Sequence, residues 1–211
     1  MSVRMSTDAR GSAGAPAVAV ESLTKRFGDL LAVDGVSFDV ADREIFGIIG
    51  PNGAGKTTLM ECLEGLQRRT SGAARVLGAD PDVADRSWRA RVGVQLQSSA
   101  LPTKMKVGEA IDLFGSFYDN PRGADELIAE LGLSGKKDSY VEKLSGGQRQ
   151  RVSIALALVS RPEIVFLDEL TTALDPQARL AMWDVVRLIR DAGCTVVMTT
   201  HYMEEAEALC D

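Results

Sequence analysis

The hydrophobic and polar positions along the chain predict strands and helices arranged around one continuous apolar strand. Residues 18–23 and 36–40 alternate apolar and polar side chains, which is typical of half-buried strands. Residues 45–49 form an unbroken apolar run, as expected of a strand buried on both faces. Two alternating strands before a buried strand predict a small antiparallel sheet beside a parallel core.

The same pattern predicts further strands and helices up to the last residues. Turn signals at residues 70–72 separate a helix after the buried strand from the next strand. Continuous apolar runs predict two more buried strands towards the end of the chain. The elements expected after this turn are strands over 74–77, 91–96, 164–167 and 195–199 and helices over 149–160, 177–192 and 202–210.

Two regions of the chain differ from this α/β pattern. Between residues 98 and 143 the spacing becomes helical, most clearly over 107–118 and 124–131, which predicts a helical subdomain inserted into the α/β domain over 18–211. Residues 1–17 are rich in Ser, Ala and Gly and lack the apolar core of a signal peptide. We expect them to be a disordered tail.

Residues 50–57 follow the first buried strand and fit the phosphate-binding pattern G-x-x-x-x-G-K-[ST]. The glycines let backbone N–H groups converge on an anion, and the following helix adds its positive N-terminal end. A lysine and a threonine hydroxyl then suit the terminal phosphates and Mg²⁺. The sequence therefore predicts a bound nucleoside triphosphate with Mg²⁺, at Gly50, Pro51, Asn52, Gly53, Ala54, Gly55, Lys56, Thr57 and Thr58.

Two other predicted strands end in polar residues. Asp168 and Glu169 close the strand over 164–167, and burying such a pair is costly unless a cation or ligand requires it. Carboxylates also occur at exposed strand ends, so both interpretations stay open. His201, the single histidine, follows the last strand, at an edge where open α/β sheets bind ligands. Most lone histidines are structural, but here three strand ends together carry phosphate-type chemistry.

Two shorter signals have a structural and a functional interpretation each. Residues 144–148 (LSGGQ) precede a helix, where Ser145 has the chemistry of an N-cap and the glycines leave backbone donors exposed. Such a pentapeptide alone is compatible with any loop-to-helix entry. Phe27 lies in a turn predicted over 25–29, where an aromatic side chain either packs or stacks on a nucleotide base.

Composition narrows the class of protein. The net charge of −6 over 211 residues argues against a nucleic-acid partner, for which a basic face is expected. No apolar run reaches the roughly 18 residues needed to span a bilayer. Cys62, Cys194 and Cys210 are unclustered, so we expect small core residues in a reducing compartment and no disulfide framework.

Taken together, these motifs resemble the nucleotide-binding domain of ABC transporters. Five elements stand in the family's order, and LSGGQ between the phosphate loop and the acidic strand separates this family from other P-loop enzymes. The resemblance covers residues 18–211 and is closest to ATPase subunits of bacterial drug or polyketide exporters with a separate permease. The five are GPNGAGKT at 50–57, a glutamine ending VGVQLQ, LSGGQ at 144–148, IVFLDE at 164–169 and His201 after TVVMTT.

The resemblance implies a fold and a role for each motif residue. The fold would be a RecA-like P-loop NTPase, α/β, with a parallel-sheet core, a small antiparallel subdomain and an inserted helical subdomain. A nucleotide held by a second copy of the domain would be contacted by Ser145, Gly147 and Gln148. The other roles are adenine stacking for Phe27, Mg²⁺ binding for Asp168, base catalysis for Glu169, γ-phosphate contact for His201 and Mg²⁺ sensing for Gln97, which is better placed than Gln95.

The implied function is ATP hydrolysis that drives transport, most similar to small-molecule export. The chain would pair head to tail with itself or another ABC subunit and dock on a separate permease at the cytoplasmic side of the membrane. Alternatives are a non-transport ABC-type ATPase, an importer subunit, or a GTP-binding switch, although the guanine-reading N-K-x-D motif is absent.

The chain departs from the family pattern at three places. Leu170 replaces the usual Pro after the catalytic Glu, and Ala173 stands where Gly is common. The family normally continues with further strands after the switch histidine, so we expect C-terminal strands to be missing after Asp211.

Overall fold

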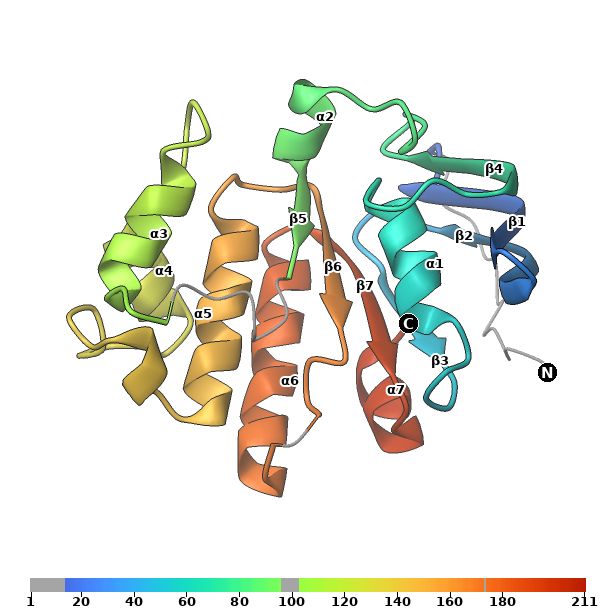
Figure 1. Cartoon of the computed structure of the whole chain (residues 1–211). Coiled ribbons are helices and arrows are strands. Elements are labelled where there is room, and N and C mark those ends of the chain that lie inside the picture. The colour runs from blue at the N-terminus through green and yellow to red at the C-terminus, as the bar shows by residue number, and fades with distance from the viewer. Residues whose placement is uncertain (1–13, 96–102, 173) are drawn as a thin grey trace.

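Two sheets of different kind form the centre of the computed structural model, which describes residues 14–95, 103–172 and 174–211 (Figure 1). The antiparallel sheet has the order β2-β1-β4 and contains β1 (Val18–Phe27), β2 (Leu30–Val40) and β4 (Ser71–Val76). The parallel sheet has the order β3-β7-β6-β5 and contains β3 (Ile45–Ile49), β5 (Val92–Val94), β6 (Ile164–Asp168) and β7 (Thr195–Thr200).

Helices cover both faces of the parallel sheet. α5 and α6 pack beside its strands, α3 and α4 lie outside α5, and α1 lies between the parallel and antiparallel sheets (Figure 1). The helices are α1 (Lys56–Leu63), α2 (Arg86–Arg91), α3 (Val107–Gly115), α4 (Ala124–Glu130), α5 (Gly146–Leu158), α6 (Pro176–Asp191) and α7 (Met203–Leu209), with a 3₁₀ turn, η2, over Val141–Lys143.

The core divides into two apolar clusters because side chains alternate along the buried strands. Along β6, Val165 and Leu167 face α5 and α6, whereas Ile164 and Phe166 pack towards α1 and the antiparallel sheet. All four side chains have no exposed surface. A strand buried on both faces therefore reads as a continuous apolar run, which is the pattern that predicted it.

The predicted α/β fold, with a parallel core beside an antiparallel sheet, is confirmed. Some element limits differ from the prediction. β1 continues to Phe27, so only residues 28–29 form the turn that we expected over 25–29. β2 begins at Leu30 and not at residue 36, because its first residues pair with β1 without alternating in polarity.

The strand expected over 91–96 is shorter than predicted, because Arg91 ends the unpredicted helix α2 and β5 covers only Val92–Val94. α2 has six residues and is capped by Asp85, which accepts a hydrogen bond from the Trp88 N–H at 2.9 Å. A helix this short shows too little periodicity for detection.

The described part of the predicted helical subdomain contains α3 and α4. Val107 and Ile111 from α3 and Leu127 and Leu131 from the α4 segment are fully or almost fully buried in the cluster that includes α5. The subdomain limits over 98–143 and the tail over 1–17 stay predictions, since both include residues outside the described ranges. Within the described ranges, no helix is long and apolar enough to cross a membrane.

Candidate functional site

The loop after β3 has the backbone geometry of an anion cradle. Gly53 and Gly55 adopt φ values of 80° and 88°, in the left-handed region that favours glycine. A Cβ at Gly55 would lie 2.1 Å from the carbonyl oxygen of Ala32, so no side chain fits there. Among the described residues no side chain caps α1, which begins at Lys56, and the N–H groups of its first turn remain available to a ligand.

Lys56 lies inside this loop, although it is a lysine. Its side chain is only 4% exposed, and its Nζ donates to the carbonyl oxygens of Gly50 at 2.9 Å and Pro51 at 3.2 Å. The same Nζ lies 3.5 Å from Glu169 Oε1. The lysine therefore connects the phosphate-type loop to the acidic end of β6.

Asp168 accepts hydrogen bonds from two hydroxyl groups. Thr57 Oγ1 donates to Asp168 Oδ2 at 2.8 Å, and Thr199 Oγ1 donates to Asp168 Oδ1. Thr57 and Asp168 thus present adjacent oxygen atoms, the ligand type that Mg²⁺ prefers. The described residues contain no cluster of three His, Cys, Asp or Glu that could hold a metal by themselves. A Mg²⁺ ion here would need further oxygen ligands from water or a phosphate.

Glu169 has an unusual backbone conformation at the end of β6. Its φ is +48°, in the left-handed region that non-glycine residues rarely adopt, and such strain is concentrated at functional sites. The Glu169 N–H donates to Thr199 Oγ1 at 3.0 Å, and Thr172 Oγ1 donates to Glu169 Oε2 at 3.4 Å. These contacts fix the carboxylate near Lys56.

A cavity of about 290 Å³ is lined by part of the predicted site, and Asp168 and His201 are not among its lining residues. Phe27 from the end of β1 and Glu169 from the end of β6 face it from two different sheets. Phe27 is 44% exposed, and Lys25 Nζ lies 4.6 Å from its ring centroid. The lining residues are Phe27, Leu30, Leu31, Ala32, Asn52, Gly53, Gly55, Lys56, Thr57, Thr58 and Glu169.

His201 follows β7 directly, at the same sheet edge. Its Nδ1 is buried and, among the described residues, has no hydrogen-bond partner. The Gly50 N–H donates to the carbonyl oxygen of Thr200 at 3.4 Å, so the phosphate-type loop and the histidine segment are joined at the ends of neighbouring strands β3 and β7.

Ser145 caps α5 as predicted, but its segment lies apart from the cavity. Ser145 Oγ accepts from the Gln148 N–H at 3.3 Å, and Gln148 Oε1 accepts from the Ser145 N–H at 3.1 Å, which forms a capping box. A Cβ on Gly147 would lie 3.7 Å from Ala178 at the start of α6. None of residues 144–148 is among those that line the 290 Å³ cavity.

Two of the four remaining positions named from the sequence, Gln97 and Ala173, lie outside the described residues. Gln95 is 7% exposed, and in the described part of the chain its Oε1 has no hydrogen-bond partner. Leu170, the departure from the family's Pro, is 1% exposed and packs in the larger apolar cluster.

Sequence reasoning missed Thr199, although a signal was present. The β6–β7 register pairs Asp168 with Thr199, and its hydroxyl contacts both Asp168 and the Glu169 N–H. A polar residue near the end of a strand that neighbours an acidic strand end is the pattern that would have identified it.

The phosphate-type loop, the acidic strand end and the two-sheet fold define a nucleotide-binding domain of the P-loop class. The chain belongs to the ABC transporter family, whose match covers residues 33–172.

Two similar proteins with known names support this family assignment. A Nod factor export ATP-binding protein I from Ralstonia nicotianae is 40% identical over 207 residues, 95% of this chain and 64% of that protein. The daunorubicin resistance ATP-binding protein DrrA3 from Streptomyces coeruleorubidus is 40% identical over 92% of this chain. The chain spans 63% to 64% of the length of these two relatives.

Two solved structures of ATP-binding cassettes have folds similar to that of this chain. The ATP-binding cassette MJ0796, in a dimeric post-hydrolysis state bound to ADP and Pi, matches with a TM-score of 0.80, 26% identity and 90% coverage of each chain. The cassette MJ1267 matches with a TM-score of 0.82 at 24% identity, which shows the shared fold.

Proposed function

We propose that this chain is the ATP-binding and ATP-hydrolysing subunit of an ABC transporter that exports a small molecule. The observation that carries the proposal is the 290 Å³ cavity, in which Phe27, the phosphate-type loop, Lys56 and Glu169 meet. An aromatic ring for the base, backbone donors for phosphates and a carboxylate for water suit ATP. The names of the relatives, which are export or drug-resistance ATP-binding proteins, support export.

The chain's own contacts support a binding step that prepares the catalytic base. In this structure Lys56 Nζ contacts Gly50, Pro51 and Glu169. ATP phosphates entering the loop compete for the lysine charge, so Lys56 moves from Glu169 to the phosphates. The freed Glu169 carboxylate then polarises the attacking water, and His201 contacts the γ-phosphate.

Mg²⁺ fits the adjacent oxygen atoms of Thr57 and Asp168, with Gln97 as the further predicted contact. When bound, the ion neutralises charge on the transferred phosphoryl group and its leaving oxygens. Thr57 and Asp168 would hold the ion. Thr199, which donates to Asp168, keeps that carboxylate oriented.

A second copy completes the site in this proposal. Ser145, Gly147 and Gln148 present helix-start donors, yet they lie against α6 of their own chain and away from its cavity. A two-fold dimer would bring each such segment to the other copy's nucleotide, since an isologous interface pairs the same surfaces reciprocally. A paired ABC subunit would serve equally, and the dimeric state named for MJ0796 supports such an assembly.

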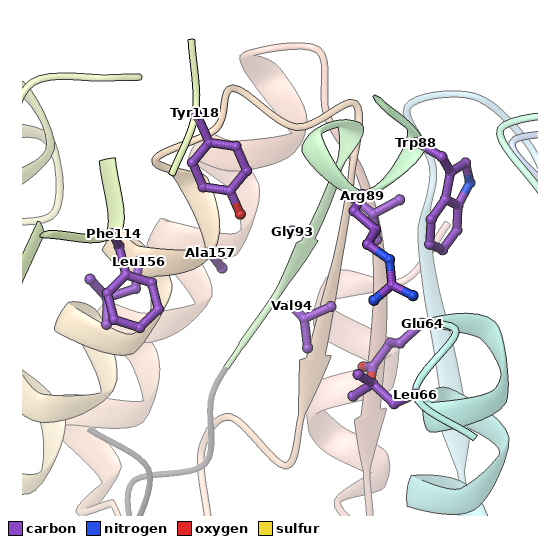
Figure 2. A pocket seen from close by; sticks show the side chains of 11 residues that line it. Glu64, Leu66, Trp88, Arg89, Gly93, Val94, Phe114, Tyr118, Leu156 and Ala157 are labelled. Atoms are coloured by element: carbon purple, nitrogen blue, oxygen red, sulfur yellow. The ribbon is translucent and has the colours of Figure 1, made fainter. Parts of the chain in front are cut away.

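The membrane partner is proposed to be a separate permease, with this chain bound at the cytoplasmic side. A cavity of about 210 Å³ lies beside β5, between α3 and α5 on one side and the end of α1 on the other (Figure 2). Leu66, which lines this cavity, is 60% exposed, and Phe117, next in the chain to the lining residue Tyr118, is 57% exposed. Exposed apolar side chains grouped near a cavity are typical of a protein interface, so we assign the permease to this face.

Two experiments test this function. The first measures phosphate release by the purified chain with Mg²⁺ and ATP, and the second measures whether GTP competes with ATP for binding. We expect ATP-dependent release that Lys56→Ala abolishes, because that variant loses the charge that offsets the phosphates. Binding of GTP but not ATP would favour a GTP switch, and wild-type protein that neither binds nor hydrolyses ATP would refute the function.

The docking face is tested in the assembled transporter. Phe117→Asp should uncouple transport while the chain's own ATPase activity persists, because the side chain is exposed and does not line the cavity of Lys56. Leu180→Asp is the matched control, since Leu180 is 56% exposed on α6. Crosslinks from the permease to α6 and none to α3 would contradict this placement.

A further inference from the structure

The residue after His201 connects the candidate switch histidine to helix α6. The Tyr202 ring centroid lies 4.0 Å from that of His201, with the two planes tilted by 38°. On α6, the guanidinium carbon of Arg179 lies 4.3 Å from the Tyr202 ring centroid, a cation–π distance. Arg179, Tyr202 and His201 therefore form a continuous stack from α6 to the end of β7.

The backbone around this stack is held at both ends. The Tyr202 N–H donates to Thr200 Oγ1 at 3.0 Å, and Thr200 is 1% exposed. One helical turn after Arg179, Trp183 Nε1 donates to Glu205 Oε1 at 3.0 Å, and Glu205 in the first turn of α7 is also 1% exposed. Side chains of α6 thus contact the histidine segment before and after the start of α7.

The His201 ring has a buried nitrogen, Nδ1, without a polar partner in the described part of the chain. Arg179 Nε is likewise buried without a partner among the described residues, so its guanidinium is oriented towards Tyr202 by stacking. The His201 ring and the Arg179 guanidinium instead both contact the Tyr202 ring, which links the histidine to α6.

We propose that Arg179 and Tyr202 are positioning residues that hold the His201 ring at the nucleotide site, an inference that rests on the proposed ATPase function. The same end of α6 also approaches the Ser145–Gln148 segment, since a Cβ on Gly147 would lie 3.7 Å from Ala178. A movement of α6 at this point therefore changes the packing of both the histidine and the α5 start.

The single histidine makes the proposal directly measurable, because its ring protons give the only imidazole signals in an NMR spectrum of the chain. In Arg179→Met, we expect the His201 ring-proton shifts to move from the wild-type values towards those of Tyr202→Ala, as the ring-current effect of Tyr202 weakens. Arg179→Lys and Tyr202→Phe keep a cation and a ring respectively, and both should stay near wild type.

Turnover provides the second measurement. We expect Arg179→Met to lower kcat about tenfold with little change in KM, because a misplaced catalytic group costs rate more than binding. Arg187→Met is the matched control: Arg187 lies two turns further along α6 and contacts Asp184 and the carbonyl oxygen of Ala208. It should change neither the His201 signals nor kcat.

Folded Arg179→Met protein with wild-type His201 shifts and wild-type kcat would overturn the proposal. If wild-type protein does not hydrolyse ATP, the proposed function fails, but the NMR comparison still decides whether Arg179 positions the histidine. Equal effects of Arg179→Met and Arg187→Met would show a general loosening of α6 and would also overturn it.

Discussion

The α1 start, at the sheet edge that carries Lys56, Asp168 and Glu169, and the α5 start at Ser145 both place glycines at a helix N-terminus, but their surroundings differ. At the sheet edge, charged and hydroxyl groups from several strands contact each other across large distances in sequence, as in the pairs Lys56–Glu169 and Thr57–Asp168. At the α5 start, the capping box of Ser145 and Gln148 is local. The contacts at the sheet edge depend on the fold, whereas those at the α5 start lie within one short segment of the chain.

The difference has a geometric cause. Parallel strands end at one edge, so loops that follow β3, β6 and β7 converge there. α5 lies on one face of that sheet, and its first turn packs against α6 of the same chain (Figure 1). In the proposed dimer the two regions meet because a second chain contributes the α5 start, and the following predictions test each side of this comparison.

The largest expected effect is at the sheet edge. Glu169→Gln should retain ATP binding and lower turnover by about 10²–10⁴-fold, the usual contribution of a general base. The glutamine keeps the size of the side chain, and the backbone contact with Thr199 does not depend on the carboxylate. Phosphate release and nucleotide titration measure the two quantities, and wild-type hydrolysis by the variant would exclude the role.

The second effect tests the α5 start. Glu169→Gln protein with saturating ATP should be dimeric in light scattering, and adding Ser145→Arg should return it to a monomer by steric block. Ser145→Ala is the control, because it removes the cap at a cost of about 1 kcal/mol in stability but leaves the space open. A dimer that persists with the arginine, or a parent that stays monomeric, would count against the shared site.

A smaller effect concerns Phe27, at the end of the cavity that is proposed to hold the nucleotide base. Phe27→Ala should weaken ATP binding by about 1–3 kcal/mol, the usual contribution of stacking on a nucleobase. Phe27→Trp should restore affinity because it keeps an aromatic face beside Lys25. If titration gives equal affinities for wild type and Phe27→Ala, the ring serves packing alone.

The smallest effect is a pH dependence of stability. Burial, together with the smaller effects of the Asp168 and Glu61 charges, raises the pKa of Glu64, at the end of α1, to about 8. A raised folded-state pKa contributes stability that is complete below the unfolded value and is lost as pH rises through about 8. Wild type should therefore lose about 1 kcal/mol between pH 7 and pH 9 relative to Glu64→Gln, measured by thermal unfolding. Parallel curves for the two proteins would contradict the assignment.

The buried strands and their polar ends were predictable because their apolar runs admit few other interpretations. β3 matches its predicted limits, and the predicted strands over 164–167 and 195–199 are each extended by one residue at the carboxyl end. The helix α2 and the early start of β2 were missed, since short elements and exposed edges carry little periodicity.

The spatial relations in the site were harder to predict than the residues. The approach of Phe27 to Glu169 depends on how α1 spaces the antiparallel sheet from the parallel one, which no local pattern encodes. The stack of Arg179 on Tyr202 likewise joins residues from α6 and from the segment after β7. Gln97 was assigned from the family resemblance and lies outside the described residues, so its role stays a prediction.

The left-handed backbone at Glu169 has a consequence for how this position evolves. With φ at +48°, a residue with a Cβ has a backbone conformational energy about 1 kcal/mol higher than glycine at this position. Selection for thermal stability alone would drift this position towards glycine, which lacks the carboxylate. At this position stability therefore favours glycine, whereas the proposed chemistry requires glutamate. In a library of variants selected only for heat resistance, the glutamate should be replaced early.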